Sequence, residues 1–150
     1  MNSKQLHEAG GARTFALVLD TGDEAMKSLS SFANEYDLDA AGFTAIGAFS
    51  RAVVAYFDLD EKDYAPIPVY EQVEVLSIVG HVTREPGGRN VHAHVVLGKR
   101  DGTAVGGHLI EGHVRPTLEI VLTESPAHLR RTKDDATGLA LIDLGDDGET

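Results

Sequence analysis

The sequence contains no cysteine and no tryptophan, and it is poor in basic residues. Without cysteine, neither a disulfide nor a thiolate metal site can form, so any transition metal has to be held by histidine and carboxylate side chains. The 24 acidic residues outnumber the 13 basic ones and give a formal net charge of −11. Because nucleic acids are bound mainly through clustered Lys and Arg side chains, we expect no direct nucleic-acid partner.

Long apolar runs are also missing from the sequence. No apolar stretch approaches the roughly 18 residues of a transmembrane helix, and the first residues lack the apolar segment of a signal peptide. We therefore expect a cytoplasmic protein without a membrane partner. The length of 150 residues suits one domain with a core of its own. We expect a flexible leader at residues 1–12, a single domain at 13–145 and a polar tail at 146–150.

The hydrophobic pattern predicts strands joined by tight turns, together with one helix. Apolar residues at three- and four-residue spacings predict a long helix that follows Thr21-Gly22-Asp23 and ends near Tyr36. The proline-containing stretch 61–71 predicts a loop or an irregular edge. Short turns favour antiparallel neighbours, so the expected class is α+β, a mainly antiparallel sheet of about seven strands with the helix packed on it. Strands are expected at residues 13–20, 38–50, 52–60, 73–83, 91–98, 104–114 and 116–124, and a strand-like segment at 138–144.

Three histidines between residues 90 and 114 predict a metal site. His92 and His94 are two residues apart on an expected strand, so both imidazoles project from the same face of the sheet. His108 supplies a third ligand from the second strand of the same hairpin. Three protein ligands with one position left for water is a common arrangement in catalytic zinc sites. The alternative is that these histidines are ordinary hydrogen-bonded strand residues.

The register of this hairpin decides whether His108 can join the site. If Asp101 and Gly102 form a two-residue turn, His94 faces Leu109 and His108 lies on the opposite face of the sheet. One inserted residue, in a bulge or in an odd-length loop, would bring His108 to the face of His94. The Gly106-Gly107 pair is a candidate for such a bulge, because glycine lowers the backbone cost.

The predicted metal is zinc, although three imidazoles also suit iron, nickel or copper. The candidate acid–base residues are Glu111, Glu74 and Glu119, each of which could instead be a solvated strand residue. The glycine-rich fingerprint of dinucleotide binding does not occur in the sequence. We therefore expect no cofactor other than a divalent transition metal.

Several segments carry a resemblance to a known family. They are LVLDTGDE (17–24), EQVEVLSIVGHV (71–82), HAHVVLGKRDGTAVGGHL (92–109) and TLEIVL (117–122). On these motifs the chain resembles the plants-and-prokaryotes-conserved (PPC) domain family over about residues 12–145. The resemblance implies an antiparallel α+β fold, a homotrimer with clefts between subunits, and metal ligands at His92, His94 and His108. The AT-hook of the plant relatives is absent, which indicates the prokaryotic stand-alone type. The fold of this family is also similar to that of acetolactate decarboxylase, a zinc enzyme.

Two functions remain open at this point. The first is a small trimeric metal-binding protein whose three-histidine site, at a subunit cleft, binds or transforms a small anionic or carbonyl ligand. Whether this makes the protein an enzyme is left open. The alternative is an oligomerisation or regulatory module without catalysis, in which DNA binding is only a family label. Its basis is the apolar stretch from Phe43 to Phe57, which suits a subunit interface.

Overall fold

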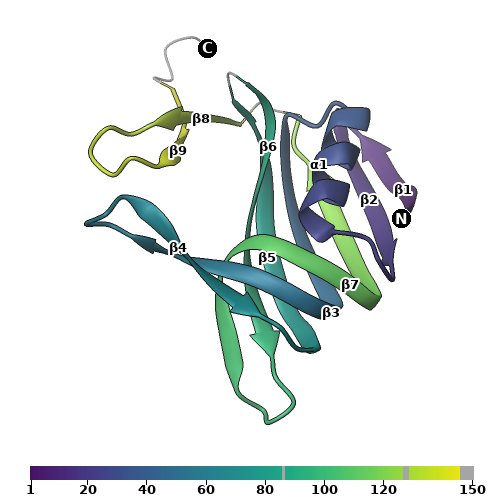
Figure 1. The fold of residues 1–150 in the computed structure, drawn as a ribbon. Coiled ribbons are helices and arrows are strands. Elements are labelled where there is room, and N and C mark those ends of the chain that lie inside the picture. The colour runs from purple at the N-terminus through teal and green to yellow at the C-terminus, as the bar shows by residue number, and fades with distance from the viewer. Residues whose placement is uncertain (86, 127–128, 146–150) are drawn as a thin grey trace.

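The computed structural model describes residues 1–85, 87–126 and 129–145, which form nine strands and one helix (Figure 1). The polar tail expected at residues 146–150 lies outside this part of the chain. The elements in chain order are β1 (Asn2–Ala9), β2 (Ala12–Asp20), α1 (Ala25–Glu35), β3 (Ala40–Asp58), β4 (Asp63–Val69), β5 (Val73–Glu85), β6 (Gly88–Gly98), β7 (Ala104–Glu124), β8 (Arg130–Lys133) and β9 (Ala140–Asp143).

The nine strands form one sheet with the order β1-β2-β7-β3-β5-β8-β9. β4 pairs with β3, and β6 pairs with both β5 and β7. The pairings of β3 with β5, β5 with β6, β6 with β7 and β7 with β3 therefore close a cycle of four strands. All pairs are antiparallel except the single bridge between β5 and β8, as expected for strands joined by short turns.

Two strands are longer than the sequence pattern predicts. The expected strands at 38–50 and 52–60 are one strand, β3, and those at 104–114 and 116–124 are one strand, β7. Their mutual register shifts between Gly47 and Phe49, between Phe49 and Arg51, and between Val53 and Val54. A β-bulge bends a strand without ending it, so an interruption of the alternation resembles a turn in the sequence.

Two expectations of irregular structure are corrected by the structure, the first in full and the second in part. Residues 1–12 are not a flexible leader, because Asn2–Ala9 pairs with β2 along its length. Every residue of β1 is exposed, so the sequence shows no alternation that would reveal a strand. Residues 63–69 form the strand β4 despite Pro66 and Pro68, so they are not a loop. Among the described strands β4 pairs only with β3 and lies at an edge, as the second alternative anticipated. An edge strand tolerates proline because its outer side needs no ladder hydrogen bonds.

The helix α1 has 11 residues and is shorter than the long helix expected. The carboxylate of Glu24, not that of Asp23, caps it by accepting from the backbone N–H of Met26 at 3.1 Å and of Lys27 at 2.8 Å. The predicted apolar face is confirmed: Leu29, Phe32 and Ala33 are buried and Met26 and Tyr36 partly buried. Among the described residues, no helix is long and apolar enough to cross a membrane.

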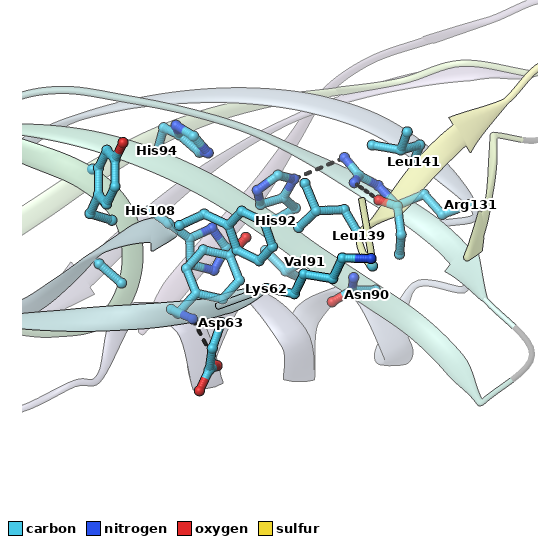
Figure 2. Close-up of a pocket in the computed structure, with 17 residues that line it drawn as sticks. Lys62, Asp63, Asn90, Val91, His92, His94, His108, Arg131, Leu139 and Leu141 are labelled. Carbon is cyan, nitrogen blue, oxygen red and sulfur yellow. Dashed lines mark hydrogen bonds between the residues drawn. The ribbon is translucent and has the colours of Figure 1, made fainter. Parts of the chain in front are cut away.

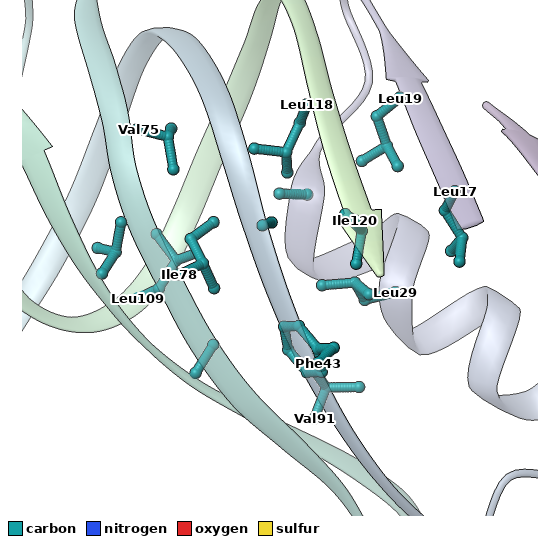
Figure 3. Close-up of a cluster of buried hydrophobic side chains, with 14 of the residues drawn as sticks. Leu17, Leu19, Leu29, Phe43, Val75, Ile78, Val91, Leu109, Leu118 and Ile120 are labelled. Atoms are coloured by element: carbon teal, nitrogen blue, oxygen red, sulfur yellow. The ribbon is translucent and has the colours of Figure 1, made fainter. Parts of the chain in front are cut away.

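Within the described residues, one face of the sheet is covered by the helix α1 and the other is not. The face toward α1 carries the core, to which the cycle of strands contributes Phe43, Val75, Ile78, Val91 and Leu109 (Figure 3). The opposite face carries apolar side chains that this chain leaves uncovered. We name this surface the open face, and it contains Val18, Ile46, Val79, Val96 and Val121, each at least 40% exposed.

Candidate metal centre

The loop between β6 and β7 sets the register of the histidine hairpin. It contains five residues, Lys99 to Thr103, and is closed by a hydrogen bond of 2.8 Å from the backbone N–H of Lys99 to the carbonyl of Thr103. The carboxylate of Asp101 accepts from the backbone N–H and the hydroxyl of Thr103, and Gly102 has a φ of +84°. This odd-length loop pairs His94 directly with His108. Opposed residues of antiparallel strands project to the same face, so the loop places the third imidazole beside the other two.

The glycine pair before His108 has a different role from the bulge considered above, since β6 and β7 run in register through it. A Cβ atom on Gly106 would lie 2.6 Å from the carbonyl oxygen of Val95, and one on Gly107 would lie 2.5 Å from that of Ala55. Neither position has room for a side chain. The two glycines therefore allow β7 to approach β6 and β3 closely at the residue that precedes His108.

The structure brings His92, His94 and His108 together. Each offers one ring nitrogen to a group whose members all lie within 4.8 Å of one another. The ring centroids are 5.1 Å apart for His92 and His94, 4.8 Å for His92 and His108, and 5.7 Å for His94 and His108. His92 and His108 are half-buried and His94 is exposed. Nitrogens bound to one zinc ion at about 2.0–2.1 Å would lie roughly 3.3 Å apart, so small rotations of these side chains would complete the site.

The hydrogen bonding of the three rings is incomplete in a way that fits a metal ligand set. Nε2 of His92 and Nδ1 of His108 are buried and have no hydrogen-bond partner among the described residues. Buried ring nitrogens without a partner are costly, and coordination of a cation would satisfy them. Burial, followed by the positive charge of Arg131, lowers the pKa of His92 to about 4. Burial also lowers the pKa of His108. Both rings are therefore neutral near pH 7, which is the form that binds metals.

The three histidines line a cavity of about 800 Å³ between the sheet and the β8–β9 hairpin (Figure 2). Tyr64 of β4 stacks on His108 with ring centroids 4.6 Å apart and an interplanar angle of 29°. It also contacts Phe57 edge to face at 5.0 Å. Apolar walls come from Val91, Leu139 and Leu141. The sheet thus holds the imidazoles on one wall, and a segment distant in sequence supplies another.

Arg131 of β8 reaches into this cavity. Its guanidinium donates a hydrogen bond of 2.9 Å to Nδ1 of His92 and one of 2.7 Å to the carbonyl of Ala140 (Figure 2). Its Nε is buried and has no hydrogen-bond partner within residues 1–85, 87–126 and 129–145. In the described residues, no carboxylate forms an ion pair with Arg131. The other charged residues of the lining are Lys62 and Asp63.

None of the three glutamates considered as acid–base candidates lines the histidine cavity. Glu111 lies on β7 and makes a very short contact with Nε2 of His113, which lowers the pKa of Glu111. Arg51 lies 3.8 Å from the same carboxylate. Glu74 and Glu119 both border a hollow beside Ile46 on the open face. Spacing along the strands did not indicate which face each glutamate would occupy relative to the cavity.

Arg131 and the β8–β9 wall are the parts of the site that the sequence did not reveal. β8 joins the sheet through one bridge, between Arg84 and Arg130. No motif or spacing connects Arg131 to the three histidines, and Arg131 follows His108 in the chain only after the rest of β7. Tyr64 lies in the stretch expected as a loop or irregular edge, and nothing in the sequence indicated a role for it in the site.

Comparison with known proteins finds solved structures that are similar to this chain over most of its length. A metal-containing protein from Archaeoglobus fulgidus is 36% identical, with 86% of this chain and 91% of that chain covered and a TM-score of 0.79. A PPC protein from Pyrococcus horikoshii is 31% identical, with coverages of 91% and 97% and a TM-score of 0.82. A structure from Ralstonia eutropha that carries a provisional DNA-binding name is 27% identical, with coverages of 87% and 91% and a TM-score of 0.82. Among curated proteins there is no match.

The family profile described as the Plants and Prokaryotes Conserved (PCC) domain matches residues 6–126. The matched segment spans β2 to β7 and includes all three clustered histidines. It ends before β8 and β9. The chain belongs to the plants-and-prokaryotes-conserved domain family.

Proposed function

We propose that this protein binds one divalent transition metal, zinc in the first instance, through His92, His94 and His108. The observation that carries the proposal is the convergence of three imidazoles within 4.8 Å, two of them with buried ring nitrogens that lack a partner. The name of the relative from Archaeoglobus fulgidus, a metal-containing protein, supports it. The absence of cysteine from the sequence leaves histidine as the natural ligand type for such a metal.

The site is open to a small ligand on the cavity side. When bound, the metal would act as a Lewis acid or lower the pKa of a bound water. The described lining makes the cavity positively charged and partly apolar, because it carries Arg131 and Lys62 but only one carboxylate, Asp63. We propose that a small anionic or carbonyl compound is bound there, and none of the described residues that line the cavity is a glutamate that would act as acid or base.

We also propose that the protein is a homotrimer. The open face supports assembly, because its apolar side chains are exposed in a single chain. The side chain of Val79, for example, is 54% exposed. His94 pairs with Val79 and lies at the border of this surface. A neighbouring subunit on the open face would therefore cover His94 and place the metal at a subunit cleft. Light scattering on the purified protein measures the number of chains.

Metal content of the untagged protein, measured by plasma mass spectrometry, tests the metal site. We expect about one metal per chain, and we expect it to be lost in His94→Ala. His7→Ala is the matched control, since His7 lies on the exposed β1 strand, and this variant should keep its metal. A wild-type protein that assembles normally but contains well under one metal per chain would contradict the proposal.

Such a result would favour the second candidate, an oligomerisation or regulatory module built on the open face. Direct DNA binding has its support in the names of relatives. It is opposed by the net charge of −11, since binding to phosphates requires clustered cations. We expect no complex in a mobility-shift assay at low salt.

A further inference from the structure

Arg131 occupies an unusual position for a half-buried cation. It contacts a neutral imidazole and a backbone carbonyl, at 2.9 Å and 2.7 Å, and has no ion pair with any described carboxylate. Its Nε is buried and finds no hydrogen-bond partner in the described part of the chain. A guanidinium that is partly removed from water normally has an anionic partner, because its desolvation is otherwise costly. Counting the described residues of the lining, the cavity holds two cationic side chains, Arg131 and Lys62, and one carboxylate, Asp63, so it is short of one negative charge.

The hydrogen bond between Arg131 and His92 bears on metal binding. A guanidinium can only donate, so Nδ1 of His92 accepts this hydrogen bond and carries no proton. The proton of the neutral ring is then on Nε2, the nitrogen that is buried and has no partner. A metal bound at Nε2 would require that proton to move to Nδ1. There the N–H group would point at the guanidinium of Arg131, which is also a donor, so the hydrogen bond could not form. A metal bound at Nδ1 would displace the guanidinium directly.

Metal binding and the contact between Arg131 and His92 therefore exclude each other. Once released, the guanidinium keeps its hydrogen bond to Ala140 through Nη1 and is left with Nε and Nη2 free. This edge of the guanidinium is the one that binds a carboxylate in a bidentate manner. A carboxylate there would also offset the repulsion between the cation of Arg131 and the metal.

We propose that Arg131 is the anion-binding residue of the cavity, and that it takes the carboxylate of a small aliphatic acid bound together with the metal. This rests on the metal site proposed above. Leu139 and Leu141, from the same hairpin as Arg131, line the cavity beside Val91. They provide an apolar surface for the short hydrocarbon part of such an acid. Because the metal frees the arginine and the acid holds it, metal and carboxylate bind with positive cooperativity.

The β8–β9 hairpin is placed to serve as this ligand-binding wall. Its turn is tied to the β3–β4 turn by a hydrogen bond of 3.4 Å from Nζ of Lys62 to the carbonyl of Asp135. In Figure 1 the two hairpins lie one above the other, and the cavity lies between them. A change at Arg131 therefore alters a wall of the cavity without altering the strands that hold the three histidines.

The test is a calorimetric titration of zinc into the full-length metal-free protein, with and without an excess of acetate. Sulfate at equal ionic strength serves as the reference anion. The variants are Arg131→Met, which removes both charge and donors, and Arg131→Lys, which keeps the charge but loses the fork. Arg130→Met is the matched control, because Arg130 is the exposed neighbour on the same strand. Circular dichroism melts establish that each variant is folded.

We expect Arg131→Met to bind zinc about tenfold more tightly than wild type in the absence of acetate, because a competing hydrogen bond and a nearby charge are gone. Acetate should tighten zinc binding to the wild type by about tenfold. The tightening should be smaller in both Arg131 variants and should equal that of the wild type in Arg130→Met. Weaker zinc binding by folded Arg131→Met would overturn the proposal, as would an unchanged acetate effect in both variants or an equal effect of sulfate. A wild type that binds no zinc would instead contradict the metal site itself.

Discussion

The replacement Gly107→Ala tests how the fold brings His108 to the other two histidines. The new Cβ would lie 2.5 Å from the carbonyl oxygen of Ala55, the residue of β3 that pairs with His108. Real Cβ atoms essentially never approach closer than 3.0 Å, so β7 and β3 would have to separate by about 0.5 Å or more. Because the contact is with backbone, side-chain rotation cannot relieve it, and we expect a loss of about 1–3 kcal/mol in the free energy of unfolding.

The separation would also move His108 relative to His94, so the affinity for zinc should fall along with the stability. Urea unfolding of the metal-free protein measures the first effect and a zinc titration measures the second. Gly42→Ala is the control, because Gly42 lies on β3 and a Cβ there meets nothing within 4 Å. It should be neutral or slightly stabilising. A Gly107→Ala variant as stable as Gly42→Ala, with unchanged zinc affinity, would refute the close-approach argument.

Two further predictions concern pH and assembly. The folded-state pKa of His92, about 4, lies below its ordinary 6.5, so between these values the unfolded chain binds a proton that the folded chain does not. In metal-free protein the free energy of unfolding should thus fall as pH drops from 6.5 toward 4. Urea unfolding across this range should show a shallower decline of this free energy with pH for His92→Gln than for the wild type. An identical pH dependence in both proteins would contradict the assignment of the effect to His92. Val79→Asp puts a charge on the open face and should give monomers in light scattering, whereas Leu59→Asp, at an exposed site in the β3–β4 turn, should assemble as wild type does. Trimers in both variants would exclude the open face as the interface.

The regular parts of the fold were predictable because their burial alternates along the chain. The segments of β2, β5 and β6 were identified in this way, as was the apolar face of α1. The elements that were missed lack such a pattern. β1 is exposed throughout, and β4 is mostly exposed and contains two prolines. Their strand structure depends on the neighbour with which each one pairs, and that neighbour is not specified locally.

The part of the site that depends on one strand was predictable, and the part that depends on pairing between strands was not. His92 and His94 share a face because of the two-residue repeat of any strand, so their proximity needed no further information. The inclusion of His108 depended on a shift of one residue in the register. That shift comes from the five-residue loop from Lys99 to Thr103. The sequence presented this loop and a bulge as alternatives and could not choose between them.

The sequence by itself determined which side chains could hold a metal, since it offers histidine without cysteine, and it determined the family through the motifs around those histidines. Only the tertiary structure decided that His108 joins the site, that Glu111, Glu74 and Glu119 do not line the cavity, and that Arg131 does. The physical reason is the range of the interactions involved. Alternation along one strand is a local property, whereas the register between strands and the position of the β8–β9 hairpin follow from backbone pairing and packing between distant segments.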